Sequence, residues 1–296
     1  MTTVRELLAG AVERFEVAEL SYGHGTTNAL DEAAWLIQHA LGVPPRDIGP
    51  LLDHGVDAAA ARKVRALIER RIRTRKPAAY LTHEAWLGSH RFYVDERVIV
   101  PRSYIFELIE RETLPLPTPK AGTGPSPAAI LDLCTGSGCL AILAALAFPK
   151  AKVDAADLSE DALAVARRNV ADYRLGRRVR LVKSDLFSAL ARRRYDLIVT
   201  NPPYVKSASM RTLPEEYRNE PRMALASGKD GLDHARVILR EAHAHLNPRG
   251  LLVMEIGHNR RALERAFPDT PFRWPPTSGG SGFVLTLARD ELPFQE

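Results

Sequence analysis

From residue 128 onward, short apolar runs alternate with segments that have the hydrophobic period of a helix, and no other feature constrains the fold of this 296-residue chain as strongly. Alternation of this kind predicts an α/β domain with a parallel sheet and helices on both of its faces. Ligands of such sheets bind at the carboxyl ends of the strands. The expected strands are 128–133, 152–156, 179–183, 195–200, 250–256 and 282–287, and the expected helices are 138–147, 159–171 and 233–246.

The N-terminal part of the chain has a helical pattern instead. Apolar residues recur every three or four positions over 3–15, Asp31 is expected to cap a second helix that ends at Leu41, and a third helix is expected over 57–73. The sequence therefore predicts a small helical domain over 1–76, a hairpin linker over 77–100 and the α/β domain over 101–296.

The linker and the segment after it have strand and turn signals. Residues 80–87 and 91–94 flank Gly88-Ser89 and predict a β-hairpin, and Pro101-Arg102-Ser103 is expected to cap the helix that follows. Residues 115–127 are rich in Pro, Gly and Ser, which predicts a surface loop. We interpret its Gly122-Thr123-Gly124 as part of that loop and not as a phosphate site, because no apolar strand precedes it.

The composition is that of an ordinary folded protein, with 45% hydrophobic and 26% charged residues. No run reaches the ~18 consecutive apolar residues that a membrane span needs, and the N-terminus lacks the apolar segment of a signal peptide. Cys134 and Cys139 are too few for a disulfide framework or a four-thiolate zinc site, and His243 and His245 point apart on a helix. We therefore expect a cytoplasmic protein that binds no metal and no membrane.

The net charge of +5 identifies no partner by itself. Basic and acidic residues balance over 1–120, so the excess lies in the remainder of the chain. Clusters of basic side chains could contact RNA phosphates weakly, although a solvated surface is the simpler interpretation. The clusters are Arg70, Arg71, Arg73, Arg75 and Lys76, and Arg192, Arg193 and Arg194.

The first strand-to-helix turn of the α/β domain has the composition of a ligand loop. Its glycines, Gly136 and Gly138, permit a tight turn and close approach of the backbone to a ligand at a helix N-terminus. The spacing Gly136-x-Gly138-x-x-Ala141, with Asp157 at the end of the next strand, also satisfies the loose fingerprint of dinucleotide-binding proteins. A nicotinamide-dependent dehydrogenase is therefore one alternative.

Acidic residues near three successive strand ends favour another ligand. Asp132 would repel a pyrophosphate but would suit the ammonium and sulfonium groups of S-adenosylmethionine. Asp157 would accept hydrogen bonds from ribose hydroxyls, and Asp185, followed by Leu186 and Phe187, suits the edge and face of an adenine ring. Three such acids at one edge of a sheet predict a ligand site.

The fourth strand runs directly into Asn201-Pro202-Pro203-Tyr204. The prolines fix the backbone, so the amide oxygen of Asn201 and the carbonyl oxygen of Pro202 can both act as acceptors for a planar NH₂ group. Two such acceptors would orient the nitrogen and direct its lone pair at an electrophilic methyl group. Tyr204 would cover the group and exclude water. This pattern predicts methyl transfer to an amino or amide nitrogen.

The combination of DLCTGSG at 132–138, Asp157, Asp185 and NPPY at 201–204 resembles the amino-group methyltransferases that use S-adenosylmethionine. The resemblance implies a Rossmann-like sheet of seven strands. The helical region, the hairpin and Pro101-Arg102-Ser103 are similar to the protein-glutamine methyltransferases, which modify a glutamine side-chain amide in release factors or in a ribosomal protein. Residues 79–103 and 213–233 most resemble the branch that acts on the third L-series protein of the large ribosomal subunit.

The resemblance also implies roles for single residues and a protein substrate, which the helical domain would recognise. Glu220 and Pro221 match a pair that lies near the active site, where Glu220 could equally form a loop salt bridge. The family often has Gly at position 134 and an aromatic residue at 186, so either Leu186 or Phe187 could cover adenine. The implied cofactor-binding residues are Asp132, Cys134, Thr135, Gly136, Ser137, Gly138, Asp157, Asp185, Leu186 and Asn201, and Asn201, Pro202, Pro203 and Tyr204 would hold the target amide.

Other functions remain open from the sequence alone. A release factor could be the substrate, and an NPPY sequence also serves the methylation of adenine or cytosine amino groups. The balanced charge of residues 1–120 argues against a nucleic-acid-binding domain there. A ribosome-assembly factor that binds the cofactor without catalysis is a further alternative, as is the dehydrogenase.

Overall fold

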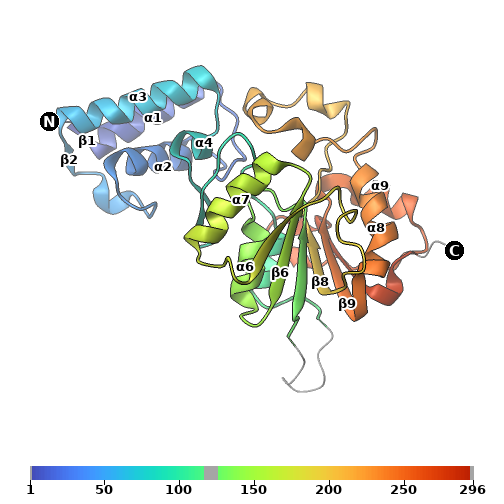
Figure 1. Ribbon diagram of the computed structural model, residues 1–296. Coiled ribbons are helices and arrows are strands. Elements are labelled where there is room, and N and C mark those ends of the chain that lie inside the picture. The colour runs from blue at the N-terminus through green and yellow to red at the C-terminus, as the bar shows by residue number, and fades with distance from the viewer. Residues whose placement is uncertain (1, 117–125, 294–296) are drawn as a thin grey trace.

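The computed structural model describes residues 2–116 and 126–293, so the string Gly122-Thr123-Gly124 lies outside the described residues. A sheet of six strands forms the centre of the larger domain, in the order β12-β9-β8-β5-β6-β7 (Figure 1). The five strands of this sheet that come first along the chain, β5 to β9, are parallel to one another, and β12 is antiparallel to β9. The strands are β5 (Ala129–Leu133), β6 (Lys152–Asp157), β7 (Val179–Lys183), β8 (Tyr195–Thr200), β9 (Leu246–Glu255) and β12 (Val284–Ala288).

Helices cover both faces of the sheet, as the alternation predicts. Successive strand residues point to opposite faces, so Ile130 packs in the core under α5 and α6 while Leu131 packs in the core under α8 and α9. Helix α7 lies beside α6 (Figure 1). The helices are α5 (Ile105–Glu110), α6 (Cys139–Ala147), α7 (Glu160–Asp172), α8 (Asp233–His245) and α9 (Arg260–Ala266).

The expected seventh strand is reduced to a single bridge. Arg273 and Thr286 exchange backbone hydrogen bonds of 3.3 and 2.9 Å at the edge of β12, but no regular strand forms around Arg273. Pro271, Pro275 and Pro276 flank this residue and have no N–H to donate to a ladder. The chain forms a short hairpin there instead, from β10 (Pro276–Thr277) and β11 (Gly280–Ser281). The α/β class is confirmed, with six strands in the central sheet of the described residues.

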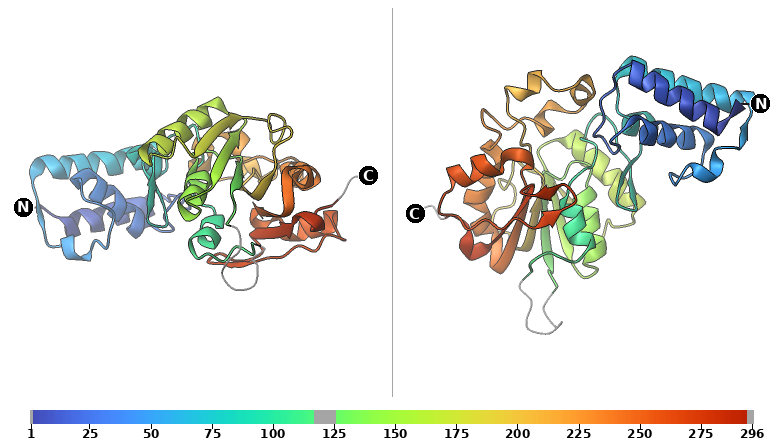
Figure 2. Two further views of the ribbon diagram at one scale, coloured as in Figure 1. Left: turned by 60° about the horizontal axis from the view of Figure 1, so that its bottom comes forward. Right: turned by 180° about the vertical axis from the view of Figure 1, so that it is seen from behind.

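The N-terminal helices pack on one another and on α7, at one end of the molecule (Figure 2). Asp57 caps the third helix by accepting hydrogen bonds from the amides of Ala59 and Ala60. The second helix begins before Asp31, because the Asn28 side chain caps it and accepts from the Asp31 amide at 2.9 Å. Our prediction that Asp31 caps it is wrong. The elements are β1 (Thr2–Thr3), α1 (Val4–Val17), α2 (Ala29–Leu41), η1 (Gly49–Leu51), β2 (Gly55–Val56) and α3 (Ala58–Thr74).

The hairpin is shorter than predicted. Its strands are β3 (Ala85–Leu87) and β4 (His90–Phe92), and the residues before them form a short helix, α4 (Ala78–Thr82). Pro77 supplies a carbonyl that accepts from the Tyr80 amide, and Ala78 and Ala79 are fully buried, where only small side chains fit. The apolar run at 80–82 therefore comes from a buried helical turn and not from a strand.

A long connection joins β8 to α8 above the carboxyl edge of the sheet and beside the helical domain (Figure 1). It contains three short 3₁₀ helices and no strand of the central sheet. None of the helices in the described residues is both long and apolar enough to span a membrane. The 3₁₀ helices are η2 (Ser209–Arg211), η3 (Glu215–Asn219) and η4 (Arg222–Ala224).

Candidate active site

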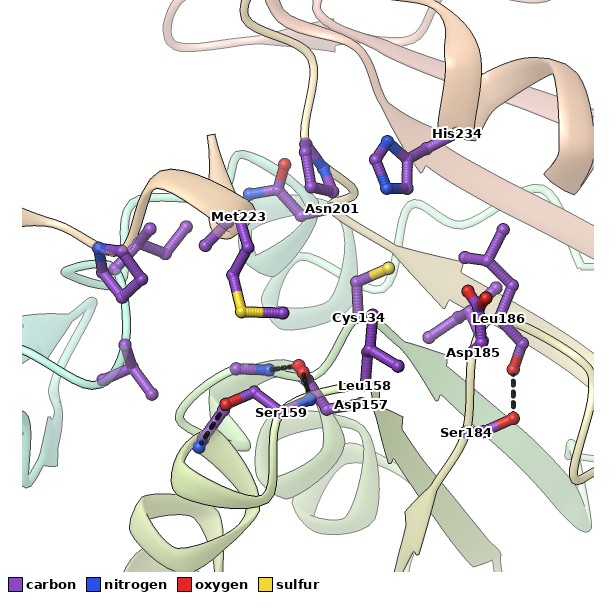
Figure 3. A pocket seen from close by; sticks show the side chains of 18 of the residues that line it. Cys134, Asp157, Leu158, Ser159, Ser184, Asp185, Leu186, Asn201, Met223 and His234 are labelled. Carbon is purple, nitrogen blue, oxygen red and sulfur yellow. Dashed lines mark hydrogen bonds between the residues drawn. The ribbon is translucent and has the colours of Figure 1, made fainter. Parts of the chain in front are cut away.

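Two adjoining cavities open at the carboxyl edge of the sheet, and three residues line both of them: Ile99, Asn201 and Ala224. The first cavity is bounded by the loops after β5, β6 and β7 (Figure 3), and the second by the loop after α1, by the Asn201–Val205 turn and by the β8–α8 connection. A group in one cavity can therefore meet a group in the other at Asn201.

The loop after β5 turns through left-handed backbone conformations. Cys134, Gly136 and Gly138 have φ angles of +60°, +55° and +81°. A Cβ atom at Gly138 would lie 3.1 Å from the Ala166 side chain on α7, whereas Gly136 has open space on its Cβ side, toward the first cavity that it lines. The positive φ of Cys134 is favourable for glycine, which explains why the family often has glycine at this position.

Asp132 organises this loop from beneath and does not line the cavity. Its Oδ2 accepts hydrogen bonds from the Thr135 hydroxyl at 2.5 Å and the Ala141 amide at 2.9 Å. Its Oδ1 is buried with no hydrogen-bond partner in the described residues, and burial raises the pKa of the carboxyl to about 7. Ser137 is also behind the wall, and its carbonyl oxygen accepts a hydrogen bond from the side-chain amide of Asn169 of α7, which the sequence did not indicate.

Asp157 lines the cavity at the end of β6. Its Oδ2 accepts from the Gly136 amide at 2.8 Å and its Oδ1 from the Ser159 amide at 2.9 Å, so the carboxylate also fixes the glycine loop. Burial raises its pKa, against the effect of these amides. Each oxygen retains a lone pair for a further donor. The loops after β5 and β6 are therefore built around one carboxylate.

The loop after β7 brings Asp185 and Leu186 to the same cavity (Figure 3). Leu186 has a φ of +45°, and its carbonyl oxygen accepts from the Ser184 hydroxyl at 2.6 Å. Phe187 turns away into the core, where its ring stacks on His245 with centroids 4.5 Å apart. Of the two candidates for covering a ring in the cavity, the structure leaves Leu186.

The Asn201–Tyr204 turn stands between the two cavities. Thr200 fixes its start, because its hydroxyl donates to the carbonyl of Leu133 at 2.8 Å and ties β8 to β5. In the part of the chain that the structure describes, neither the Asn201 side chain nor the Pro202 carbonyl has a hydrogen-bond partner. Two polar acceptors are thus free at the junction. Pro203 lines the first cavity and Pro202 the second.

Tyr204 is held rigidly in the wall of the second cavity. Its carbonyl accepts from Asn259 at 2.7 Å, and its ring packs on Gly257, where an added Cβ would lie 2.7 Å from the ring. Burial, and then the nearby Glu255 carboxylate, raise the pKa of its hydroxyl. Tyr204 therefore stays protonated at neutral pH.

Sequence reasoning missed four segments of the cavity walls. Arg97 and Val98, Met223, and His234 line the first cavity, and the loop at 20–27 lines the second. Only the resemblance at 79–103 and 213–233 pointed to two of these segments. These segments do not directly follow strands of the central sheet and are far apart in the sequence. No local sequence pattern therefore indicates that they meet.

Both interpretations of Glu220 hold together. Its buried carboxylate forms a salt bridge with the partly exposed Arg102, with contacts of 2.5 and 2.7 Å, and accepts from the Val100 amide at 3.0 Å. It also lies next to both cavities, because Arg102 lines the second cavity and Pro221 lines the first. Desolvation opposes ionisation of Glu220, but Arg102 lowers its pKa to about 2.

A second buried carboxylate connects the β8–α8 connection to the helical domain. Glu216 of η3 accepts from the Ser21 amide at 3.1 Å, from Arg71 of α3 at 3.3 Å and from Arg75 at 3.4 Å. Arg71 is fully buried and also donates to Glu32 of α2 at 2.6 Å. The basic cluster at 70–76 is therefore partly an internal structural element.

Comparisons with known proteins agree with this arrangement. A family model described as "Methyltransferase small domain" matches residues 121–228, and one described as "PrmC N-terminal domain" matches residues 6–82. A protein of Neisseria meningitidis serogroup B named ribosomal protein uL3 glutamine methyltransferase is 52% identical, over 100% of this chain and 96% of its own. A protein of the same name from Burkholderia pseudomallei is 50% identical, over 98% of this chain and 96% of its own.

A third protein of that name, from Bradyrhizobium diazoefficiens, is 46% identical over 99% of this chain and 92% of its own. Among solved structures, a methyltransferase from Pyrococcus furiosus matches with a TM-score of 0.50 and 21% identity, over 77% of this chain and 98% of that chain. At this identity the structural match supports the fold alone.

Proposed function

Because this chain belongs to the family of ribosomal protein uL3 glutamine methyltransferases, we propose that it transfers a methyl group from S-adenosylmethionine to the side-chain amide nitrogen of a glutamine in uL3. The observation that carries the proposal is the position of Asn201, which lines both cavities. Family membership removes the dehydrogenase suggested by the Gly136-x-Gly138-x-x-Ala141 spacing. Since the substrate is a ribosomal protein, we place the reaction in the cytoplasm.

The residues of the first cavity fit S-adenosylmethionine. Asp157 offers carboxylate oxygens for ribose hydroxyls, and Asp185 with Leu186 offers an acceptor and an apolar face for adenine. The unpaired, buried Oδ1 of Asp132 favours a cation near the glycine loop. Asp132, Thr135, Ser137 and Gly138 would act by shaping this loop from behind. Cys134, Gly136 and Asn201 would contact the cofactor directly.

When bound, the cofactor supplies an electrophilic methyl group on a sulfonium. The chain supplies the geometry: the Asn201 Oδ1 and the Pro202 carbonyl each accept one hydrogen of the glutamine NH₂ group. This opposes delocalisation of the nitrogen lone pair and points it toward the first cavity. Pro203 fixes the turn, and Tyr204 excludes water from the second cavity.

The proton released from the methylated nitrogen needs no dedicated base. No carboxylate lines the second cavity among the described residues, and Tyr204 stays protonated because its pKa is raised. An amide nitrogen that gains a methyl group is strongly acidic and releases its proton to water. Catalysis would then depend on positioning and on the two fixed acceptors.

The domains would divide the work. The helical domain, over 1–76, would recognise the protein substrate, since its loop at 20–27 lines the second cavity. The hairpin linker over 77–100 would join it to the catalytic domain over 101–296, with Ile99 and Arg102 carrying the connection to the site.

The test uses the purified protein with labelled S-adenosylmethionine and, separately, unmodified uL3, an unmodified release factor and RNA. Mass spectrometry locates the added methyl group. We expect one methyl group on a glutamine of uL3 and no labelling of the other substrates. Labelling of the release factor alone would move the protein to the sister branch, and labelling of RNA alone would mean that Asn201 and Pro202 hold a base.

A further inference from the structure

Arg102 is the one permanently charged side chain among the described residues that line the second cavity. It follows the hairpin linker, and Glu220 of the β8–α8 connection fixes it through two hydrogen bonds of 2.5 and 2.7 Å. Paired contacts of this kind hold the plane of a guanidinium in one orientation. The Tyr217 ring lies 5.6 Å from the guanidinium carbon and forms a further support. Arg102 is thus a rigid group, positioned in the cavity where the substrate would enter.

The guanidinium retains unused donors. Its hydrogen bonds in the described residues take both Nη1 hydrogens, to Glu220 and to the Val100 carbonyl at 3.2 Å, and one Nη2 hydrogen, to Glu220. A guanidinium has five N–H groups, so the Nε–H and one Nη2–H have no partner. The side chain keeps 21% of its surface exposed, whereas that of Glu220 has none. Of the two side chains of the pair, only that of Arg102 is therefore accessible to a ligand.

The charge of the pair selects the kind of acceptor. Glu220 remains ionised at neutral pH and compensates the charge of Arg102, so the pair is neutral as a whole. A carboxylate or phosphate ligand would meet the negative charge of Glu220 beside the positive charge of Arg102. A neutral oxygen acceptor, such as a peptide carbonyl, has no such penalty.

We propose that Arg102 binds the protein substrate by donating a hydrogen bond to a backbone carbonyl oxygen next to the target glutamine, and that Glu220 is the residue that positions it. This inference rests on the proposed function for the identity of the substrate. The acceptor is a backbone carbonyl and not the oxygen of the target amide. A cation on that oxygen would draw the nitrogen lone pair into the amide and slow methyl transfer.

The experiment measures binding without turnover. The protein is saturated with S-adenosylhomocysteine, and its affinity for unmodified uL3 is determined by calorimetry, next to kcat and KM. For Arg102→Gln we expect binding of uL3 to weaken at least about 10-fold, with kcat and the affinity for S-adenosylhomocysteine changed less than about 3-fold. Arg102→Lys retains the charge but lacks the planar guanidinium. Its affinity for uL3 should lie between that of Arg102→Gln and that of the unaltered protein. Glu220→Gln should raise the KM for uL3, as Arg102→Gln should.

Arg177→Gln is the matched control, because Arg177 is exposed between α7 and β7, at the edge of the sheet opposite the two cavities and outside the helical domain. It should bind uL3 like the unaltered protein. Arg102→Gln with unaltered affinity for uL3 would overturn the inference, as would a variant that loses kcat at constant KM. A protein that binds uL3 through Arg102 but transfers no methyl group would leave this inference standing and refute the proposed function.

Discussion

The two cavities that meet at Asn201 are built in different ways. The first is formed mainly by loops that directly follow β5, β6, β7 and β8. The Asp157 carboxylate joins the loops after β5 and β6 by accepting from the Gly136 and Ser159 amides. The second is assembled from segments near residues 20, 100 and 215, which are far apart in the sequence and joined through the buried carboxylates of Glu216 and Glu220. Local backbone geometry thus forms the proposed cofactor site, and tertiary ion pairs form the proposed substrate site.

This difference suggests how the protein separates cofactor binding from the recognition of one particular substrate. Cofactor binding depends on the sheet edge, which any change in substrate would leave intact. Substrate binding depends on the β8–α8 connection and on its contacts with the helical domain. Substitutions on one side should therefore leave the other side's binding unchanged, except at the junction.

The largest effect is expected at the junction. Asn201→Ala removes one of the two acceptors at the reacting nitrogen and should lower kcat on the order of 10²–10³-fold, as for the loss of other fixed groups that act on the transition state. Affinity for S-adenosylhomocysteine, measured by calorimetry, should fall only a few-fold. A variant that keeps more than a tenth of the activity would contradict this, because Asn201 would then not hold the reacting nitrogen between the two cavities.

The next effect should be confined to the first cavity. Asp157→Ala removes a half-buried carboxylate that fixes the glycine loop and lines the first cavity, so affinity for S-adenosylhomocysteine should fall about 10–100-fold. Binding of uL3 in the presence of saturating S-adenosylhomocysteine should be retained. Loss of both affinities to the same extent would show that the two sites are not built independently.

A smaller effect should be confined to the second cavity. Glu216→Gln keeps the shape of the side chain but removes the charge between Arg71 and Arg75. We expect KM for uL3 to rise about 3–10-fold and the free energy of unfolding to fall by about 1–3 kcal/mol, measured by denaturant titration. The exposed Glu69 on α3, changed to Gln, is the control for charge alone. An altered affinity for S-adenosylhomocysteine would contradict the separation.

The smallest effect concerns stability against pH on the cofactor side. Burial raises the pKa of Asp132 from 3.8 to about 7, so the folded protein holds a proton that the unfolded chain releases. Its contribution to stability is present in full below pH ~4 and is lost as the pH rises through 7. Asp132→Asn cannot ionise, so its Tm should fall less between pH 5 and 8 than that of the unaltered protein.

Glu255 also has a pKa raised to about 7 by burial, so part of the pH dependence should persist in Asp132→Asn. The double variant with Glu255→Gln should reduce it further. An unchanged slope of Tm against pH in Asp132→Asn would mean that this carboxyl is not held protonated beneath the loop.

The fold and the cofactor side were largely predictable from the sequence, because their signals are local. Apolar runs indicated the six strands. The polar residues at the strand ends, Asp157, Asp185 and Asn201, indicated the lining of the first cavity. Asp132 was recognised as part of this region, but its position under the loop was not, since a strand residue's depth depends on the helix packed above it. The seventh strand failed for a local reason, the prolines around Arg273.

The substrate side was mostly not predictable. Pairing of Glu220 with Arg102 and of Glu216 with Arg71 joins residues more than 100 positions apart, and no periodicity indicates such contacts. The basic cluster at 70–76 illustrates this, because Arg71 looks like a surface residue in sequence and is fully buried in the structure. The short helix at 78–82 was missed because buried alanines override the strand pattern of their neighbours.

The most direct test of the account is a crystal structure of the protein with S-adenosylhomocysteine and unmodified uL3. We expect the cofactor product in the first cavity, the target glutamine in the second, and the amide nitrogen within about 3.2 Å of both the Asn201 Oδ1 and the Pro202 carbonyl oxygen. A glutamine held elsewhere, or one whose nitrogen contacts neither acceptor, would contradict it.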